Sequence, residues 1–239
     1  MEHHAMTGTM DSTTTGGRVM RRMQRLMTAA VATAAIPMGM LAGCTQVRPV
    51  VQEGQDWAVN TASSVFDRKV TDDPIVLEAL GPIEVDVINF AGDVVIEVDP
   101  DATTATIAMT RRATHGYGRT EEAEYSLSQI DASVGLTGGE LGQRLVVRTW
   151  TDHAEPHFQR VDMRITVPET EGVYVETRRG RVQARNVAGP IEVTNDEGEI
   201  RVMTTRAIDD PVMLINHGGD VVFRVRGESR GMIDAATIR

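Results

Sequence analysis

An internal repeat centred on glycine constrains the fold of this chain more than any other feature of its sequence. Four glycines stand at equivalent positions of the repeat: Gly92, Gly180, Gly198 and Gly219. Apolar residues stand seven and then five positions before them: Val85, Val173, Ile191 and Val212, then Val87, Val175, Val193 and Leu214. Others stand two and then four positions after them: Val94, Val182, Ile200 and Val221, then Ile96, Ala184, Val202 and Phe223. This alternation predicts a strand, a tight turn and a second strand in each copy.

The turn of each copy carries a signal of its own. Three positions before the glycines stand residue types whose side chains hydrogen-bond to turn backbone: Asn89, Thr177, Asn195 and Asn216. The glycines supply the positive φ that tight turns often need. We therefore expect these residues and the glycines to form the repeat turns, and a ladder of Asn side chains wherever copies stack.

Two arrangements of the copies fit the pattern, and both make the domain all-β. The last three glycines are 18 and 21 residues apart, near the length of one rung of a β-solenoid, where copies stack on a continuous core. In the other arrangement each turn closes a hairpin, which gives a twisted antiparallel β-repeat domain. Either way we predict at most one short helix, after a helical signal segment.

The register of the repeat continues to the end of the sequence. Ile233 and Ala235 fall at the two inward positions of a fifth copy, and Thr237 falls at its Asn/Thr position. The glycine of that copy would lie just beyond Arg239. We expect a β-repeat domain over 75–239 that is truncated at this end or lacks a terminal cap.

The stretch between the first and second copies has a different character. Alternating or β-rich segments predict strands at 104–110, 145–150 and 161–167. Residues 120–130 predict a short helix with Thr120 as its N-cap, because acidic residues follow at once and favour the positive end of a helix.

The N-terminal residues resemble the signal of a bacterial lipoprotein. Four arginines lie within 18–25, and residues 27–43 are apolar or small apart from two threonines. The run Leu41, Ala42, Gly43 and Cys44 resembles a lipobox. The resemblance implies that residues 1–43 are a signal peptide cleaved after Gly43, and that Cys44 becomes a lipidated first residue.

A lipid on Cys44 decides where the protein resides. Two or more acyl chains give stable anchoring where a single chain does not. We interpret residues 44–74 as the lipidated N-terminus and a tether, since 45–55 show little periodicity and 72–74 read as a turn. Beyond the first dozen residues an alternative stays open, in which Trp57, Val65 and Phe66 belong to an element that docks on the domain. The predicted location is outside the cytoplasm, with the protein exported and lipid-anchored to the bacterial cell envelope. The expected partner is then membrane lipid, which the protein contacts through Cys44.

The charge balance excludes one class of partner. The sequence has 24 Lys and Arg against 34 Asp and Glu, a net charge of −10. The proposed signal carries +2, so its removal leaves −12. Binding to nucleic acid needs a basic surface that neutralises phosphates, so we expect no nucleic-acid partner.

The β region contains three characteristic phrases, Ala91–Ile96, Ile165–Pro168 and Gly218–Val221. With them the chain resembles, over about residues 80–239, a bacterial putative-adhesin family with β-strand repeats whose function is largely uncharacterised. It implies a β-solenoid or twisted sheet, often in a lipoprotein. It brings no catalytic residues, so we expect a protein that is not an enzyme and needs no cofactor.

The expected function is therefore adhesion or structural interaction in the envelope, with an envelope protein or glycan as partner. Two alternatives remain at the level of the sequence. One is a carbohydrate-binding or glycan-cleaving β-helix domain. The other is an envelope sensor or assembly factor that presents a sheet edge to another protein.

Residue types found in metal sites gather in one loop: Asp152, His153, Glu155 and His157. Pro156 disfavours the regular helix that would place both histidines on one face. We interpret this segment as a solvated hairpin loop, with His153 and His157 as weak candidates for a metal and no metal site expected.

Two further groups of residues have ordinary interpretations. His115, Tyr117 and Arg119 lie in a glycine-interrupted stretch that we interpret as an exposed loop. Acidic residues follow three of the repeat glycines, at Asp93, Glu199 and Asp220, while Arg181 interrupts this row. Turn chemistry explains the row better than a ridge that binds calcium or sugar.

Overall fold

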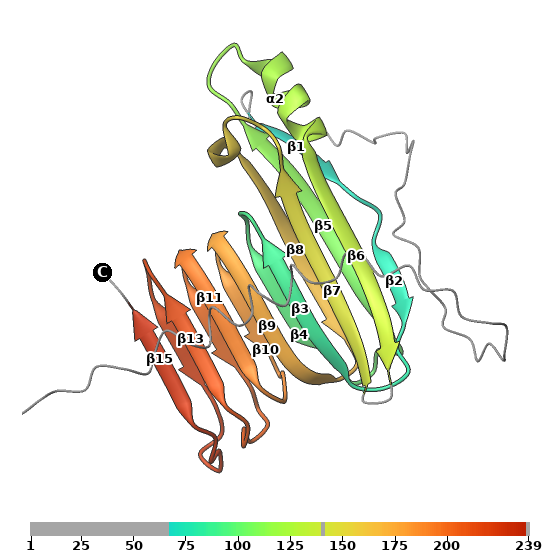
Figure 1. The fold of residues 1–239 in the computed structure, drawn as a ribbon, viewed down its shortest axis with the longest axis vertical. Helices are drawn as coiled ribbons and strands as arrows, with labels where there is room; N and C mark the ends of the chain where they lie inside the picture. Colours follow the sequence, from blue (N-terminus) through green and yellow to red (C-terminus); the bar gives the residue numbers. More distant parts are fainter. Residues whose placement is uncertain (1–66, 140–141, 238–239) are drawn as a thin grey trace, which may run out of the picture. The chain divides into compact units, whose positions relative to one another are not determined.

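A computed structural model describes residues 67–139 and 142–237 of the chain (Figure 1). Strands make up most of this part, with one helix, α2 (Thr120–Ser128), and one 3-10 turn, η1 (Pro156–Phe158). The predicted all-β class with at most one short helix is confirmed for the described residues. The expected signal segment, the 41–43 cleavage motif and Cys44 lie outside them.

The strands form two sheets, which we call sheet A and sheet B. The spatial order in sheet A is β1 (Asp67–Thr71), β5 (Thr104–Thr114), β8 (Gln159–Val167), β4 (Val94–Val98), β10 (Val182–Arg185), β12 (Ile200–Met203) and β14 (Val221–Arg224), and β2 (Ile75–Glu78) also pairs with β5. The order in sheet B is β15 (Ile233–Thr237), β13 (Val212–Asn216), β11 (Ile191–Glu197), β9 (Thr170–Arg179), β3 (Ile83–Asn89), β7 (Gly142–Thr151) and β6 (Ile130–Gly139).

The repeat copies stack as parallel rungs and do not form hairpins. In each copy the turn carries the chain from sheet B to sheet A, as from β9 to β10 and from β11 to β12. Equivalent residues pair across neighbouring copies, as Val173 does with Ile191 and Ile191 with Val212. The antiparallel arrangement is wrong for the repeats. It occurs only where β5, β6 and their partners pair, so the sheets are mixed.

The first copy lies inside the stack, although it comes first in the sequence. β3 pairs with β7 on one side and β9 on the other, and β4 pairs likewise with β8 and β10 (Figure 1). The segments predicted at 145–150 and 161–167 are strands, and they form an additional rung without a repeat glycine. The sequence pattern did not predict this order.

Two predicted boundaries need correction. Helix α2 has Arg119, not Thr120, at its N-cap, and it ends at Ser128 because Ile130 begins β6. The tether expected at 44–74 is wrong in its last part, since β1 pairs with β5 along its whole length. The rest of that range, 44–66, lies outside the described residues.

The core fills the space between the inner faces of the two sheets. Alternate side chains of the strands point inward, and those at Val85, Ile96, Leu145, Ile165 and Ile191 are almost completely buried. Strand β15 continues the register as predicted for a fifth copy, with Ile233 beside Val212. Its residues are exposed in the described structure.

The repeat glycines lie where neighbouring turns touch. Gly180, Gly198 and Gly219 all have positive φ, at 126°, 131° and 129°. A Cβ at Gly198 would overlap the carbonyl oxygen of Gly180, and one at Gly219 would overlap that of Gly198. The turns therefore need glycine both for backbone conformation and for the close approach of one rung to the next.

The Asn side chains connect successive turns. Asn195 Nδ2 donates to the Gly180 carbonyl at 3.1 Å, and Asn216 Nδ2 donates to the Gly198 carbonyl at 2.8 Å. Asn89 Nδ2 donates to the Val161 carbonyl at 3.0 Å. The three Asn side chains thus bond their turns to the neighbouring rung, whereas Thr177 Oγ1, at the same position of the second copy, is buried without a hydrogen-bond partner in the described part of the chain.

Replacing Asn89 with alanine should destabilise the domain by about 2 kcal/mol. Asn89 is buried, bonds to Val161 and Gly92, and accepts from Thr149 Oγ1 at 2.6 Å, so its loss leaves buried groups unpaired. Chemical denaturation of Asn89→Ala measures the change. Thr194→Ala, on the outer side of β11, is the control and should change stability by less than about 0.5 kcal/mol. Equal effects of the two substitutions would refute a structural ladder.

Candidate functional site

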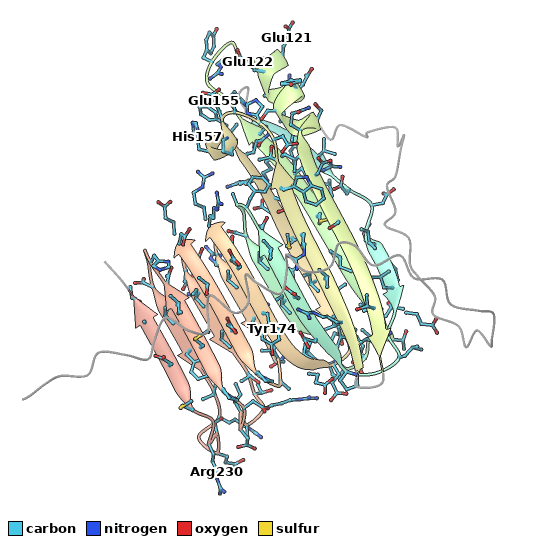
Figure 2. The ribbon with its side chains drawn as sticks, viewed as in Figure 1. Glu121, Glu122, Glu155, His157, Tyr174 and Arg230 are labelled. Atoms are coloured by element: carbon cyan, nitrogen blue, oxygen red, sulfur yellow. The ribbon has the colours of Figure 1, made fainter. Side chains whose placement is uncertain are left out.

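Two loops that are far apart in the sequence meet at the α2 end of the domain. His115 and Arg119 come from the loop between β5 and α2, and His153 and Phe158 come from the segment between β7 and β8. The His115 ring lies 5.7 Å from the His153 ring and 4.7 Å from the Phe158 ring. We call these residues, with Glu155 and His157, the histidine cluster; Figure 2 labels Glu155 and His157.

Charged contacts fasten the two loops together. Arg119 donates to Glu155 at 2.9 Å and also pairs with Glu122 of α2. Its guanidinium lies 5.5 Å from the centre of the Phe158 ring, within the range of a cation–π contact. The hydrogen bond from Arg119 lowers the pKa of Glu155 below its ordinary value.

These contacts correct the interpretation of both segments as separate solvated loops. His115 is only 2% exposed, so this end of the first segment belongs to the interior. Tyr117 is 86% exposed and fits the expected loop. Asp152 is also exposed. The contact between the two loops was not predicted from the sequence, because 38 positions separate His115 from His153.

The two weak metal candidates, His153 and His157, make contacts of other kinds. The Glu155 N–H donates to His153 Nδ1 at 3.1 Å, and the His157 ring packs on Phe158 at 4.0 Å. Among residues 67–139 and 142–237, no group of three or more His, Cys, Asp or Glu side chains is placed to hold a metal ion. The described cluster packs aromatic rings and pairs charges.

The His115 side chain is unusual because both of its ring nitrogens are buried without a hydrogen-bond partner. Burial lowers its pKa below the ordinary value of 6.5, and the neighbouring Arg119 and His153 lower it further. Glu122 and Glu155 act in the opposite direction. A neutral imidazole therefore fits this place, and a protonated one does not.

Acid should weaken the domain through His115. Because its pKa is lowered in the fold, the unfolded chain binds more protons between that lowered value and 6.5. The free energy of unfolding should therefore fall as the pH drops through this window. Thermal unfolding between about pH 7.5 and about pH 5 measures it. His115→Leu should remove this part of the slope, and an unchanged slope in the variant would contradict the assignment.

Two members of the acidic row at the turns, Asp93 and Glu199, make contacts within the stack. Asp93 Oδ1 accepts from the Arg181 N–H at 2.9 Å, and Glu199 pairs with the Arg181 side chain at 3.4 Å. The Asp93 N–H donates to Asp162 Oδ1 at 3.1 Å. These bonds connect neighbouring rungs, as turn chemistry predicts.

The two sheets carry opposite charge. Strands of sheet A have nine basic residues and four acidic ones, a net charge of +5: Arg68, Lys69, Arg111, Arg112, Arg160, Arg164, Arg185, Arg201 and Arg224 against Asp67, Glu78, Glu97 and Asp162. Strands of sheet B have nine acidic residues and four basic ones, a net charge of −5: Glu84, Asp86, Asp131, Glu171, Glu176, Glu192, Asp196, Glu197 and Asp234 against Arg144, Arg148, Arg178 and Arg179.

This segregation changes the meaning of the acidic composition. The described domain does not present one uniformly acidic surface. Its inner faces are apolar, so the charges lie on the outer faces and edges of the two sheets. The domain has two differently charged sides.

Comparison with known proteins gives distant likenesses. No protein-family model matches the sequence, and no curated protein matches it. A putative cell adhesion protein from Clostridium sporogenes is 6% identical with a TM-score of 0.36, over 72% of this chain and 99% of its own. A putative adhesin from Bacteroides fragilis is 10% identical with a TM-score of 0.23, over 71% of this chain and 97% of the adhesin chain. A putative lipid binding protein from Parabacteroides distasonis is 10% identical with a TM-score of 0.24, over 75% and 97%.

Proposed function

We propose that this chain is an exported lipoprotein of the bacterial cell envelope, and that its β-repeat domain is a non-enzymatic module for adhesion or structural interaction. The resemblance of residues 41–44 to a lipobox supports the anchor. Two acyl chains on Cys44 would hold the protein stably at a membrane. Among the described residues, no helix is long and apolar enough to cross one.

The opposite charge of the two sheets is the observation that supports an interaction module most strongly. Inward side chains of both sheets form one apolar core, which keeps the outer faces in place. Outward side chains are then free to differ between the faces, and they do so by ten units of net charge, from +5 to −5. Complementary charge gives an interface its specificity and its rate of association.

Site-specific photo-crosslinking in cells tests the interaction. A photoreactive amino acid replaces Gln183 on the outer side of sheet A or Thr194 on the outer side of sheet B. At least one position should give defined adducts with an envelope component in the full-length protein. Val193, which is buried in the core, is the matched control and should give none. The proposal would be contradicted if both outer positions gave the same crosslinking pattern as Val193.

A further inference from the structure

Six arginines in or next to the strands of sheet A are arranged in pairs around shared carboxylates. Three such triads occur in the described structure: Arg164 and Arg185 lie 3.2 and 3.8 Å from Glu97, Arg201 and Arg181 lie 2.5 and 3.4 Å from Glu199, and Arg112 and Arg160 lie 3.0 and 3.8 Å from Asp162. Each triad has a net charge of +1. We call the surface that they form the triad face.

Within the triads, the positive groups lie outermost. The side chain of Glu97 is 33% exposed, while those of Arg164 and Arg185 are 58% and 41% exposed. Glu199 is 25% exposed beneath Arg181 and Arg201, which are 56% and 40% exposed. The carboxylates thus orient the guanidinium groups, and each triad keeps one arginine that is more than half exposed: Arg164, Arg181 or Arg160.

Guanidinium groups held in this way suit phosphate. Their planar set of donors binds two oxygens of one phosphate group at once. The triads extend across successive strands from β5 to β12, and neighbouring strands in a sheet lie about 4.8 Å apart. The partner of such a face therefore needs many anionic groups spread over a plane.

Features of the triad face favour a lipid surface over a glycan. Five neighbouring strands of sheet A contain a single aromatic residue, Phe223, and its side chain packs against the core: β8, β4, β10, β12 and β14. The face therefore has no aromatic platform of the kind that lines sites for sugars and other ring compounds. An anionic bilayer offers phosphates in a plane, and basic residues bind it at close range.

We propose that the triad face binds anionic phospholipid headgroups of the membrane that holds the Cys44 lipid, so that sheet A faces the bilayer and sheet B faces away. This inference rests on the proposed function, because the anchor brings the domain to that membrane. Charge then selects the orientation.

The sole cysteine of the sequence makes the orientation measurable. With Cys44 lipidated, an introduced cysteine is the only free thiol of the mature protein. Gln183→Cys on sheet A and Thr194→Cys on sheet B each carry a fluorophore, and the purified lipidated protein is reconstituted into vesicles. The vesicles contain phosphatidylcholine alone or with phosphatidylglycerol, and a quencher is attached to a small share of the headgroups.

The label at 183 should be quenched only in vesicles with phosphatidylglycerol, and quenching should weaken with salt. The label at 194 should stay unquenched in both. Arg185→Glu with Arg201→Glu should reduce the apparent affinity for phosphatidylglycerol by roughly tenfold or more. Arg178→Glu, on the outer side of sheet B, adds negative charge without touching the triad face and should leave quenching at 183 unchanged.

Two results would overturn the inference while leaving the proposed function intact. One is equal quenching at both positions, or quenching at 183 that does not depend on phosphatidylglycerol. The other is binding of soluble polygalacturonate at the triad face in preference to phosphatidylglycerol, which assigns the face to an acidic glycan. A mature protein that carries no lipid fails to enter the vesicles at all, and that failure counts against the proposed function itself.

Discussion

Substitution of Gly198 by alanine should destabilise the domain by about 3 kcal/mol or more, a large part of the stability of a typical domain. Two causes add. The φ of Gly198 is 131°, a conformation that residues with a side chain rarely adopt. Its added Cβ would also overlap the carbonyl oxygen of Gly180, and the obstacle is backbone that belongs to the neighbouring rung. Relief of the overlap requires separation of the two turns.

The matched control for this prediction is Gly135→Ala in β6. No atom lies within 4 Å of the place that a Cβ on Gly135 would take, and the φ of Gly135 is not positive, so alanine should be tolerated there. Thermal and chemical unfolding of both variants measure the difference. If Gly198→Ala unfolds at the same denaturant concentration as the wild type, the rungs are not packed turn against turn as described.

Replacement of Cys44 by serine should almost completely abolish the lipid-modified, membrane-anchored form of the protein. Serine lacks the thiol to which the diacylglycerol is attached, and signal cleavage in lipoproteins follows that attachment. Metabolic labelling with a clickable fatty acid should mark the wild type and not Cys44→Ser. The variant should also keep its leader, which leaves it larger on a gel.

A nearby substitution separates loss of the lipid from general damage to export. Thr45→Ala changes the residue next to Cys44 and leaves Leu41 to Cys44 intact, so labelling and cleavage should proceed. Label incorporated equally into wild type and Cys44→Ser would place any lipid elsewhere and contradict the proposed anchor.

The repeat was readable from the sequence because its signals are local. Alternation sorts inward from outward residues within a strand, and Asn or Thr with glycine marks each turn. The alternation alone did not decide between hairpins and stacked rungs. In both arrangements the same side chains point inward, and only the pairing of distant strands, such as β3 with β9, distinguishes them.

The position of the inserted rung was not readable for a related reason. β7 and β8 repeat the inward pattern with Leu145 and Ile165, but their connection is η1 and its flanking loop in place of a glycine turn. A search centred on glycine therefore passes over them. The histidine cluster depends on the same connection, since that loop places His153 beside His115.

The opposite charge of the sheets did have a sequence signal. Strands before three of the glycines carry acidic outward residues, such as Glu176 and Glu192, and strands after three of them carry an arginine: Arg185, Arg201 and Arg224. Since a turn takes the chain from one sheet to the other, this alternation predicts two charged sides once rungs are assumed. The net charge of the chain conceals it.

Mass spectrometry of the mature N-terminus tests the central claim, a lipid-anchored β-repeat protein, most directly. Protein purified from membranes is digested, and its first peptide is identified. We expect a peptide that begins at Cys44 and carries the mass of a diacylglyceryl group, with or without a further acyl chain. A peptide that reads through Gly43 into an unmodified Cys44 would contradict the claim.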